Sequence, residues 1–283
     1  MLLPLIIRGS KFVIGLGFAF VLMLALIGTV STAINSPTKK TAEEELHLKP
    51  KDVTFASDGP FGKFDVAQLQ RGFHVYKEVC SNCHSLSLAS FRELEGIGYN
   101  EAQVKKIAAD WGTKQPTFDP KTGDRGERTN KPSDHFPAVY YAANGTPPDL
   151  TLIAKARHGG GAYVYSLLTG YVPATKEEKE NSKKRAAMPD FKTPEGGHYN
   201  PYFANLNIAM PQPLTTEGQV EYTDGTRATV DNMAKDVAAF LTWTAEPTAQ
   251  TRKQTGFAVI GFLLLTCLLA FGAYRSVWAG VKH

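Results

Sequence analysis

Two long apolar segments stand at opposite ends of a mostly polar chain. The first covers residues 12–34 and follows Arg8 and Lys11, and the second covers residues 256–274 and contains no charged residue. About 20 apolar residues in a helix, rising 1.5 Å each, match the hydrocarbon core of a bilayer. The pattern therefore predicts membrane-directed helices at both ends and a water-exposed domain between them.

The N-terminal segment, assigned to residues 1–35, has two interpretations. A basic start, an apolar stretch and the small residues Ser31, Thr32 and Ala33 are typical of a secretory signal that is cleaved after Ala33. The apolar stretch is also long enough to remain as an uncleaved anchor. In both cases it directs the following residues across a membrane.

The C-terminal segment predicts a transmembrane anchor over residues 250–276, followed by a short tail over residues 277–283. Arg252 and Lys253 precede the apolar run and Arg275 follows it, so the basic residues alone do not orient the helix. A buried core helix is the alternative, and the absence of any charge in the run argues against it.

The central part, residues 36–249, predicts a mainly α domain with long loops and a small β-hairpin. Residues 36–60 are polar and predict a linker or a strap over the surface. Three stretches have apolar residues at helical spacing. The first opens at Asp65 and brings Cys80 to its end (Val66, Leu69, Phe73 and Tyr76). The others are residues 101–111 (Val104, Ile107 and Trp111) and residues 230–243 (Val230, Met233, Ala234, Val237, Phe240 and Leu241).

The segments that join these helices are punctuated by turn residues. Asp65 and Gln68 resemble a capping box at the start of the first helix. Residues 115–137 are rich in proline, glycine and charge and predict a surface loop, and residues 176–185 predict an exposed insertion. Short β-type runs flank Asp224 and Gly225, which predicts the hairpin there.

Composition excludes two classes of protein. Lys and Arg number 31 against 27 Asp and Glu, a balance that does not suggest a nucleic-acid surface. There are three cysteines, of which Cys80 and Cys83 lie close together and Cys267 lies alone in the apolar run. This number and spacing exclude a disulfide framework, and Cys267 is best explained as a small hydrophobic residue.

Residues 80–84 read Cys-Ser-Asn-Cys-His, the C-x-x-C-H pattern of c-type haem attachment. Cys80 and Cys83 would form thioethers to the two vinyl groups, which places His84 as an axial iron ligand. A zinc half-site would need a second Cys/His pair, and a dithiol redox site would need a βαβ context. We therefore predict one covalently bound haem c. Because such haem is attached on the export side, the tail should be cytoplasmic.

The second axial ligand decides what the iron does. Two strong protein ligands favour electron transfer, whereas an open position binds or activates small ligands. Met188 and Met210 both precede proline in loop-like stretches, and their spacing leaves both open. Met233 lies on the apolar stripe of a helix, so it is expected to pack in the core. His135 and His158 are alternative iron ligands, although each is more simply explained as an ordinary polar residue of a loop.

Several stretches together resemble the cytochrome c1 family, the haem subunits of the quinol–cytochrome c oxidoreductase (bc1) complex. They occur in the family's order, and the resemblance runs from Gly59 to the C-terminus. The stretches are GPFGKFDVAQLQRGFHVYKEVCSNCHSL (59–86), PPDLTLIAKARHGGGAYVYSLLTGY (147–171), HYNPYFANLNIAMPQPL (198–214) and the final hairpin, helix and span.

The resemblance implies roles for particular residues. It selects Met210 as the distal iron ligand and places Pro148 near His84. It also implies that Arg157 lies against a haem propionate and that Tyr163 lies near the propionates. An arginine there is chemically reasonable, since a buried carboxylate needs a charge-assisted donor. Two places depart from the family pattern: residues 144–146 form a shorter loop, and residues 174–192 are an insertion without a counterpart.

The resemblance also implies a function and partners. The chain would carry single electrons from the Rieske iron–sulfur subunit to cytochrome c, beside cytochrome b, and would not be an enzyme by itself. It would be a single-pass protein of the inner (cytoplasmic) membrane with its haem domain in the periplasm, and no nucleic acid is implied. The acidic runs at residues 43–45 and 177–180 are either docking sites for a basic cytochrome c or a solvated surface.

Two other classes of protein fit the motif alone. One is a tethered haem enzyme or gas sensor with an open iron. The other is a haem subunit of a terminal oxidase. Binding of carbon monoxide to the reduced protein identifies the first, and the complex that co-purifies identifies the second.

Overall fold

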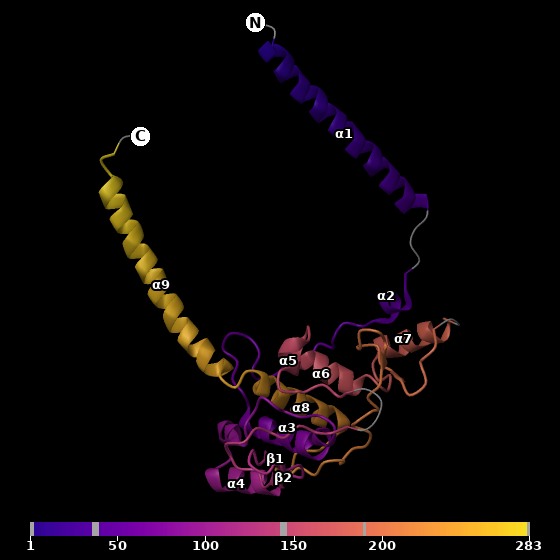
Figure 1. The fold of residues 1–283 in the computed structure, drawn as a ribbon, viewed down its shortest axis with the longest axis vertical. Coiled ribbons are helices and arrows are strands. Elements are labelled where there is room, and N and C mark those ends of the chain that lie inside the picture. The colour runs from indigo at the N-terminus through magenta and orange to yellow at the C-terminus, as the bar shows by residue number, and fades with distance from the viewer. Residues whose placement is uncertain (1–2, 36–39, 142–145, 189–190, 282–283) are drawn as a thin grey trace. The chain divides into compact units, whose positions relative to one another are not determined.

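The computed structural model describes residues 3–35, 40–141, 146–188 and 191–281. Residues 1–45 and 46–283 form two separate units (Figure 1). The loop at residues 144–146 was expected to be short, and its first two residues lie outside the described residues. The elements are α1 (Leu3–Asn35), α2 (Ala42–Leu46), α3 (Val66–Glu78), η1 (Cys80–Asn82), η2 (Phe91–Ile97), α4 (Glu101–Asp110), β1 (Gln115–Phe118), β2 (Arg125–Arg128), α5 (Ile153–Ala156), α6 (Gly160–Thr169), α7 (Lys176–Ala186), β3 (His198–Tyr199), β4 (Asn207–Ile208), α8 (Val230–Ala245) and α9 (Ala249–Trp278).

Helices α3 and α8 pack together at the centre of the second unit (Figure 1). Helix α3 begins at Asp65, whose carboxylate accepts the N–H groups of Ala67 and Gln68 at 3.0 and 3.3 Å. This confirms the N-terminal cap. The reciprocal half of the predicted capping box is wrong, because the Gln68 side chain donates instead to Asp236 on α8 at 3.1 Å. The start of α3 is thereby tied to α8.

The contact between α3 and α8 is unusually close at Gly72. A Cβ atom at this position would lie 2.1 Å from the carbonyl oxygen of Asp236. The neighbouring Arg71 forms an ion pair with the Asp236 carboxylate at 2.8 Å and another with Asp224 at 2.7 Å. The two helices are therefore held by backbone proximity and by a half-buried charge cluster.

An aromatic cluster fills the space between α3, α8 and α4. Phe91 and Phe136 lie with ring centroids 4.2 Å apart, and Trp111 packs 5.0 Å from Phe136. Tyr76 and Phe240 join them from α3 and α8. The predicted apolar faces are largely confirmed by the buried residues of α3, α4 and α8.

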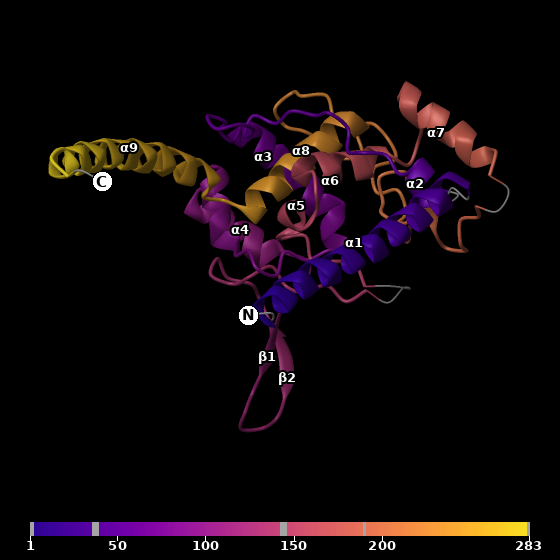
Figure 2. The same cartoon turned by 90° about the horizontal axis from the view of Figure 1, so that it is seen from above.

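The small sheets lie elsewhere than the sequence predicts. Strands β1 and β2 pair antiparallel within residues 115–128, which were expected to be loop, and extend away from the helices (Figure 2). Strands β3 and β4 form a second short pair. The hairpin predicted at Asp224 is wrong, since residues 220–229 contain no strand. Strands β1 and β2 are mostly exposed on both faces, so they show no apolar alternation. The mainly helical class with a small hairpin is confirmed.

Helix α7 corrects the expectation of a wholly exposed insertion. Its Glu178 is 2% exposed and Asn181 is 4% exposed. The Glu178 carboxylate contacts the Lys51 ammonium at 2.9 Å and accepts from the Tyr202 hydroxyl at 3.1 Å. A strongly charged helix can bury a carboxylate when a cation and other donors reach it.

The expected strap is present from Leu46 onwards. The backbone N–H of Leu48 donates to the Pro201 carbonyl, and that of Lys51 donates to the Ser166 hydroxyl, both at 2.8 Å. These bonds hold residues 46–51 against α6 and the loop before β4.

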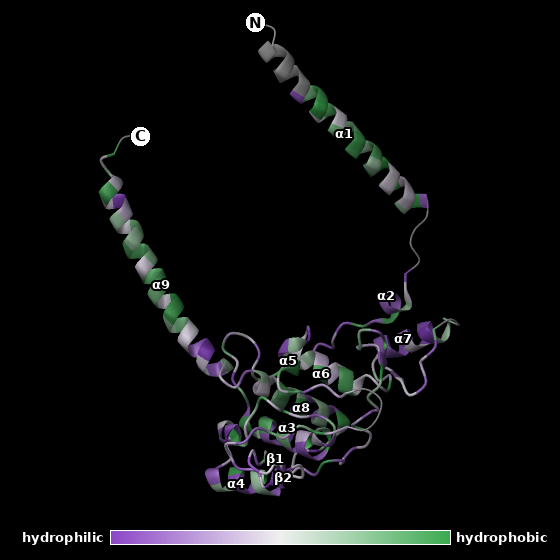
Figure 3. Cartoon of the chain, in the orientation of Figure 1, coloured by the Kyte–Doolittle hydropathy of each residue, from purple (hydrophilic) through white to green (hydrophobic). Residues whose placement is uncertain are grey.

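Among the described residues, two helices are long and apolar enough to cross a membrane, and both stand out in hydropathy (Figure 3). They are residues 11–35 of α1 and the whole of α9. None of the residues of α9 is buried within the protein. The alternative of a buried core helix is therefore excluded for α9, and the expected anchor remains.

Candidate haem site

The C-x-x-C-H motif forms a tight turn at the end of α3. The carbonyl oxygen of Cys80 accepts the N–H groups of Cys83 and His84 at 3.1 and 2.9 Å. This single 3-10 turn puts both thiols and the imidazole within one short segment. Neither cysteine forms a disulfide, and the side chains of both are partly covered by the domain.

The imidazole of His84 is prepared to bind a metal through Nε2. Its Nδ1 lies 2.7 Å from the carbonyl oxygen of Pro148. Because a carbonyl only accepts, Nδ1 carries the proton and Nε2 keeps its lone pair. Burial lowers the pKa of His84, and the bond to Pro148 opposes this shift only in part. The ring is therefore neutral at neutral pH, as an iron ligand must be.

Two residues for which the sequence predicted no role at the site hold this turn in place. The hydroxyl of Tyr76 donates to the His84 carbonyl at 2.9 Å. The Asp149 carboxylate accepts from the Ser87 N–H at 2.6 Å and from the Ser85 hydroxyl at 2.9 Å. Asp149 follows two prolines, and this turn signal was the only available hint of its role.

The protonation of Asp149 follows from the same contacts. Burial would raise the pKa of its carboxyl, but the hydrogen bonds from Thr151 and Ser87 outweigh burial and lower the pKa. The carboxylate is therefore charged at neutral pH. It clamps the segment that carries Pro148 onto the segment that carries His84.

The donor set fits a covalent haem better than the two alternatives. Burial, with a smaller contribution from Cys83, raises the pKa of Cys80 to about 12, so the thiol is protonated at neutral pH. A dithiol redox site instead needs a lowered pKa. Within the described residues, no group of three or more His, Cys, Asp or Glu side chains could hold a bare metal ion. Thioether formation uses the thiols, and Nε2 of His84 remains for the iron.

The two methionines left open by the sequence have different surroundings. Met210 follows β4 and packs, partly buried, against the same hydrophobic core as Cys80. Its carbonyl accepts from the Tyr171 hydroxyl at 2.8 Å. Met188 follows α7, and its N–H donates to the Arg185 carbonyl at 3.0 Å. Met233 is fully buried in the core, as its helical position predicted.

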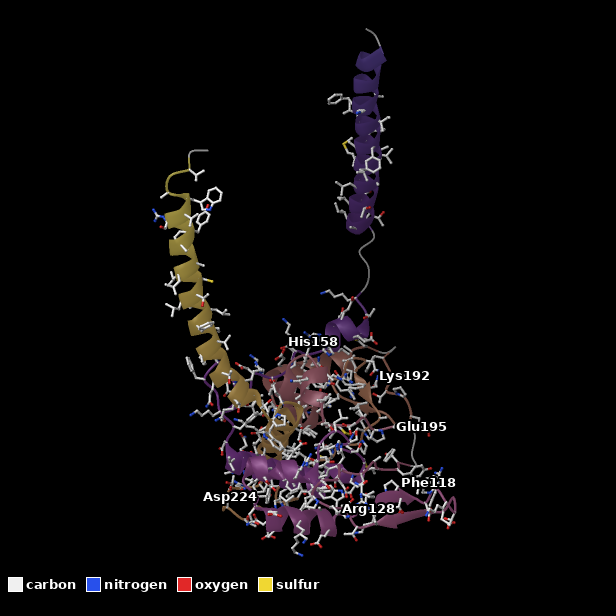
Figure 4. All side chains as sticks on the ribbon, turned by 60° about the vertical axis from the view of Figure 1, so that its left-hand side comes forward. Phe118, Arg128, His158, Lys192, Glu195 and Asp224 are labelled. Atoms are coloured by element: carbon white, nitrogen blue, oxygen red, sulfur yellow. The ribbon has the colours of Figure 1, made fainter. Side chains whose placement is uncertain are left out.

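The other site residues lie on separate elements. Arg157 is exposed at the end of α5, and its guanidinium donates to the Ala156 carbonyl at 3.3 Å. Tyr163 lies on α6 and packs against the core. The exposed His135 ring contacts the Ser87 carbonyl at 2.6 Å, and His158 is also exposed (Figure 4). The hydrogen bonds of the turn thus bring Cys80, His84 and Pro148 together, whereas the haem-facing roles of Arg157 and Tyr163 stay predictions.

A mainly helical domain with a C-x-x-C-H turn and an oriented, neutral histidine has the defining features of a c-type cytochrome. The Cytochrome C1 family matches residues 55–281, and the chain belongs to that family.

Curated relatives agree along most of the chain. It is 40% identical over 277 residues to "Cytochrome c1 1, heme protein, mitochondrial" of Arabidopsis thaliana, which covers 94% of this chain and 85% of the relative. It is 38% identical over 253 residues to "Cytochrome b-c1 complex catalytic subunit, mitochondrial" of Candida albicans, covering 86% and 81% of the two chains. It is also 41% identical over 253 residues to "Cytochrome b/c1" of Bradyrhizobium diazoefficiens, covering 82% of this chain and only 36% of that relative.

Proposed function

We propose that this chain is an electron carrier with one covalently bound haem c. Cys80 and Cys83 supply the thioether sulfurs, His84 is the proximal ligand and Met210 is the distal ligand. The observation that carries the proposal is the His84 ring, whose Nδ1 is committed to the Pro148 carbonyl at 2.7 Å. Membership of the cytochrome c1 family supplies the context of electron transfer in the bc1 complex.

The residues of this chain would hold the haem and shield it from water. The haem supplies the one-electron change, and the protein sets ligand strength, orientation and access of water. The bond to Pro148 fixes the plane of the His84 ring, and Met210 gives a neutral thioether that favours the reduced state. No acid, base or nucleophile is needed, so the chain is proposed not to be an enzyme by itself.

The partners belong to the same proposal. The electron would come from the Rieske iron–sulfur subunit and pass to cytochrome c. Helix α9 would anchor the domain beside cytochrome b on the periplasmic face of the inner membrane, with residues 277–283 in the cytoplasm. The relative called "Cytochrome b/c1" supports proximity to cytochrome b, because its name joins both cytochromes in one chain. Arg157 and Tyr163 are proposed to contact the haem propionates.

The axial ligands can be tested by optical spectroscopy and redox titration of the full-length holoprotein in detergent. The reduced protein should show a low-spin c-type spectrum that carbon monoxide does not change. Met210→Leu should lower the potential and allow carbon monoxide to bind, because it opens one iron position. The matched control Met188→Leu should change neither property.

Opposite results have a clear meaning. If Met210→Leu keeps both the potential and the exclusion of carbon monoxide, Met210 is not the ligand. If the unmodified protein already binds carbon monoxide, the iron is open and the electron-carrier proposal fails.

A further inference from the structure

The loop of residues 57–62 is attached to the first turns of α9. The ammonium of Lys253 donates to the carbonyl oxygens of Ser57 and Gly59 at 2.6 and 2.7 Å. Four residues further along α9, the ring of Phe257 stacks on Phe61 with centroids 4.9 Å apart and an interplanar angle of 4°. Two independent contacts therefore join this loop, which we call the 57–62 loop, to the base of the apolar helix.

The 57–62 loop has a built conformation. It is closed by a hydrogen bond from the Lys63 N–H to the Ala56 carbonyl at 2.9 Å. The Asp58 carboxylate accepts the Phe55 N–H at 2.7 Å. At Gly62, a Cβ atom would lie 2.0 Å from the Asp58 carbonyl oxygen, so only glycine fits this approach. The position of Phe61 is thus set by the backbone around it.

Phe61 presents its ring outward in spite of this order. Its side chain is 78% exposed although one face is stacked, and Phe257 is 44% exposed. A single exposed aromatic residue means little. Phe61, however, extends the apolar surface of α9 at the helix end where the basic residues Arg252 and Lys253 stand. Aromatic rings beside basic side chains are typical of the boundary between a span and water.

Lys253 also places the loop at this boundary. Its ammonium donates to two backbone carbonyls of the 57–62 loop. The loop therefore lies at the same height along α9 as this charged group, which stands at the start of the apolar run. A lysine that ends a span keeps its ammonium at the polar interface while its stem lies along apolar surface. The loop bound to that ammonium should then reach the interface as well.

We propose that the 57–62 loop is a second membrane contact, in which Phe61 enters the interfacial region of the phospholipid bilayer beside Phe257. The inference rests on the proposed role of α9 as the membrane span. A single helix would let the domain pivot about its base, whereas a second contact to one side fixes its tilt. The loop leads through Asp65 into α3, which ends at the haem-attachment turn. The membrane contact thereby sets the orientation of the site relative to the bilayer.

Site-directed spin labelling tests this contact in the full-length holoprotein, reconstituted in phospholipid nanodiscs. On a Cys267→Ala background, single labels are introduced by Phe61→Cys, Leu264→Cys and Phe118→Cys. Leu264 is in the middle of α9, and Phe118 is a 63% exposed side chain on β1 (Figure 4). Power saturation compares access of oxygen, which enters lipid, with access of a water-soluble nickel chelate. The haem spectrum of each variant confirms that it is folded.

We expect the ratio of oxygen to nickel access at position 61 to be several-fold higher than at position 118 and below that at position 264. If the access ratio at position 61 equals that at position 118 while position 264 lies deep in lipid, the second contact is overturned and the membrane anchor stands. A label at 61 shielded from both reagents also overturns it, since protein would then cover the site. A water-accessible label at 264 overturns the span itself, and with it the membrane part of the proposed function.

Discussion

At the scale of single residues, the close approach of α3 to α8 requires glycine at position 72. Alanine usually stabilises a helix interior relative to glycine by about 1 kcal/mol. Here the methyl group would meet the backbone of α8 at 2.1 Å, which no rotamer change relieves. The close approach therefore outweighs helix propensity.

We predict that Gly72→Ala destabilises the protein by at least about 1–3 kcal/mol, the usual cost of overpacking a core. Denaturant unfolding followed by circular dichroism measures the change. Gly112→Ala is the matched control, because a Cβ at position 112 meets nothing within 4 Å. Equal stability of the two variants would show that α8 can move away at little cost.

Residue-level chemistry could be predicted from the sequence where it is local. Cys80, Cys83 and His84 lie within one pentapeptide, so the attachment motif can be recognised from neighbouring positions. Asp149 and Tyr76 could not be predicted in this way. Their roles depend on contacts with residues 84–87 that only the folded chain creates. The family resemblance implied that Pro148 lies near His84. In the structure the Pro148 carbonyl accepts a hydrogen bond from the His84 ring.

At the scale of elements, the buried Glu178 connects α7 with the strap and with Tyr202. Its carboxylate contacts the Lys51 ammonium, and Lys51 also donates to Thr169 at the end of α6. Burial raises the pKa of Glu178, but the hydrogen bonds from Thr175 and Lys51 outweigh burial and lower it. A lowered pKa in the folded state means that the charged form stabilises the fold.

Glu178→Gln should therefore lower the free energy of unfolding at pH 7 by about 3 kcal/mol, because it leaves a largely buried cation without its partner. The difference from the unmodified protein should be complete above the ordinary glutamate pKa of 4.5 and shrink as the pH falls below it. Urea unfolding at several pH values measures both effects.

Glu180→Gln on the same helix is the control, because its pair with Lys184 is exposed and 3.8 Å long. Surface pairs of this kind contribute little. If both variants lose the same stability, the buried network is not what holds α7. The burial of Glu178 also removes it from the acidic run at residues 177–180, so any docking role of that run falls to Glu177 and Glu180.

Elements with a clear period could be predicted, and those without one could not. Helices α3, α4 and α8 carry apolar stripes and were expected close to their observed bounds. Strands β1 and β2 are mostly exposed, so neither shows the alternation by which a strand is recognised. The hairpin predicted at Asp224 is absent, and the Asp224 side chain forms an ion pair with Arg71.

At the scale of the whole molecule, α9 meets the domain through a small junction. Glu246 contacts Lys155 at 3.3 Å and also pairs with Arg252, so it joins α5, α8 and α9. The helix beyond this junction has no buried residues. Length and hydropathy were enough to predict it, since a span depends on composition and not on tertiary contacts.

Deleting residues 249–283 should leave the haem domain folded and release it into the soluble fraction, provided that the leader is cleaved after Ala33. Haem staining after membrane fractionation, with an optical spectrum of the released protein, measures both properties. A truncated chain that stays in the membrane with a native spectrum would show that α1 is kept as a second anchor. Loss of the spectrum would show that α9 contributes to the fold.

The pairing of α3 with α8 has a consequence for the order in which the protein is assembled. Nearly the whole domain lies between these two helices in the sequence, so their contact is strongly non-local and forms late. A chain that crosses a membrane from its N-terminal end delivers Cys80 and Cys83 long before α8 arrives to cover α3. The segment that carries both thiols is therefore available before the contact between α3 and α8 can form.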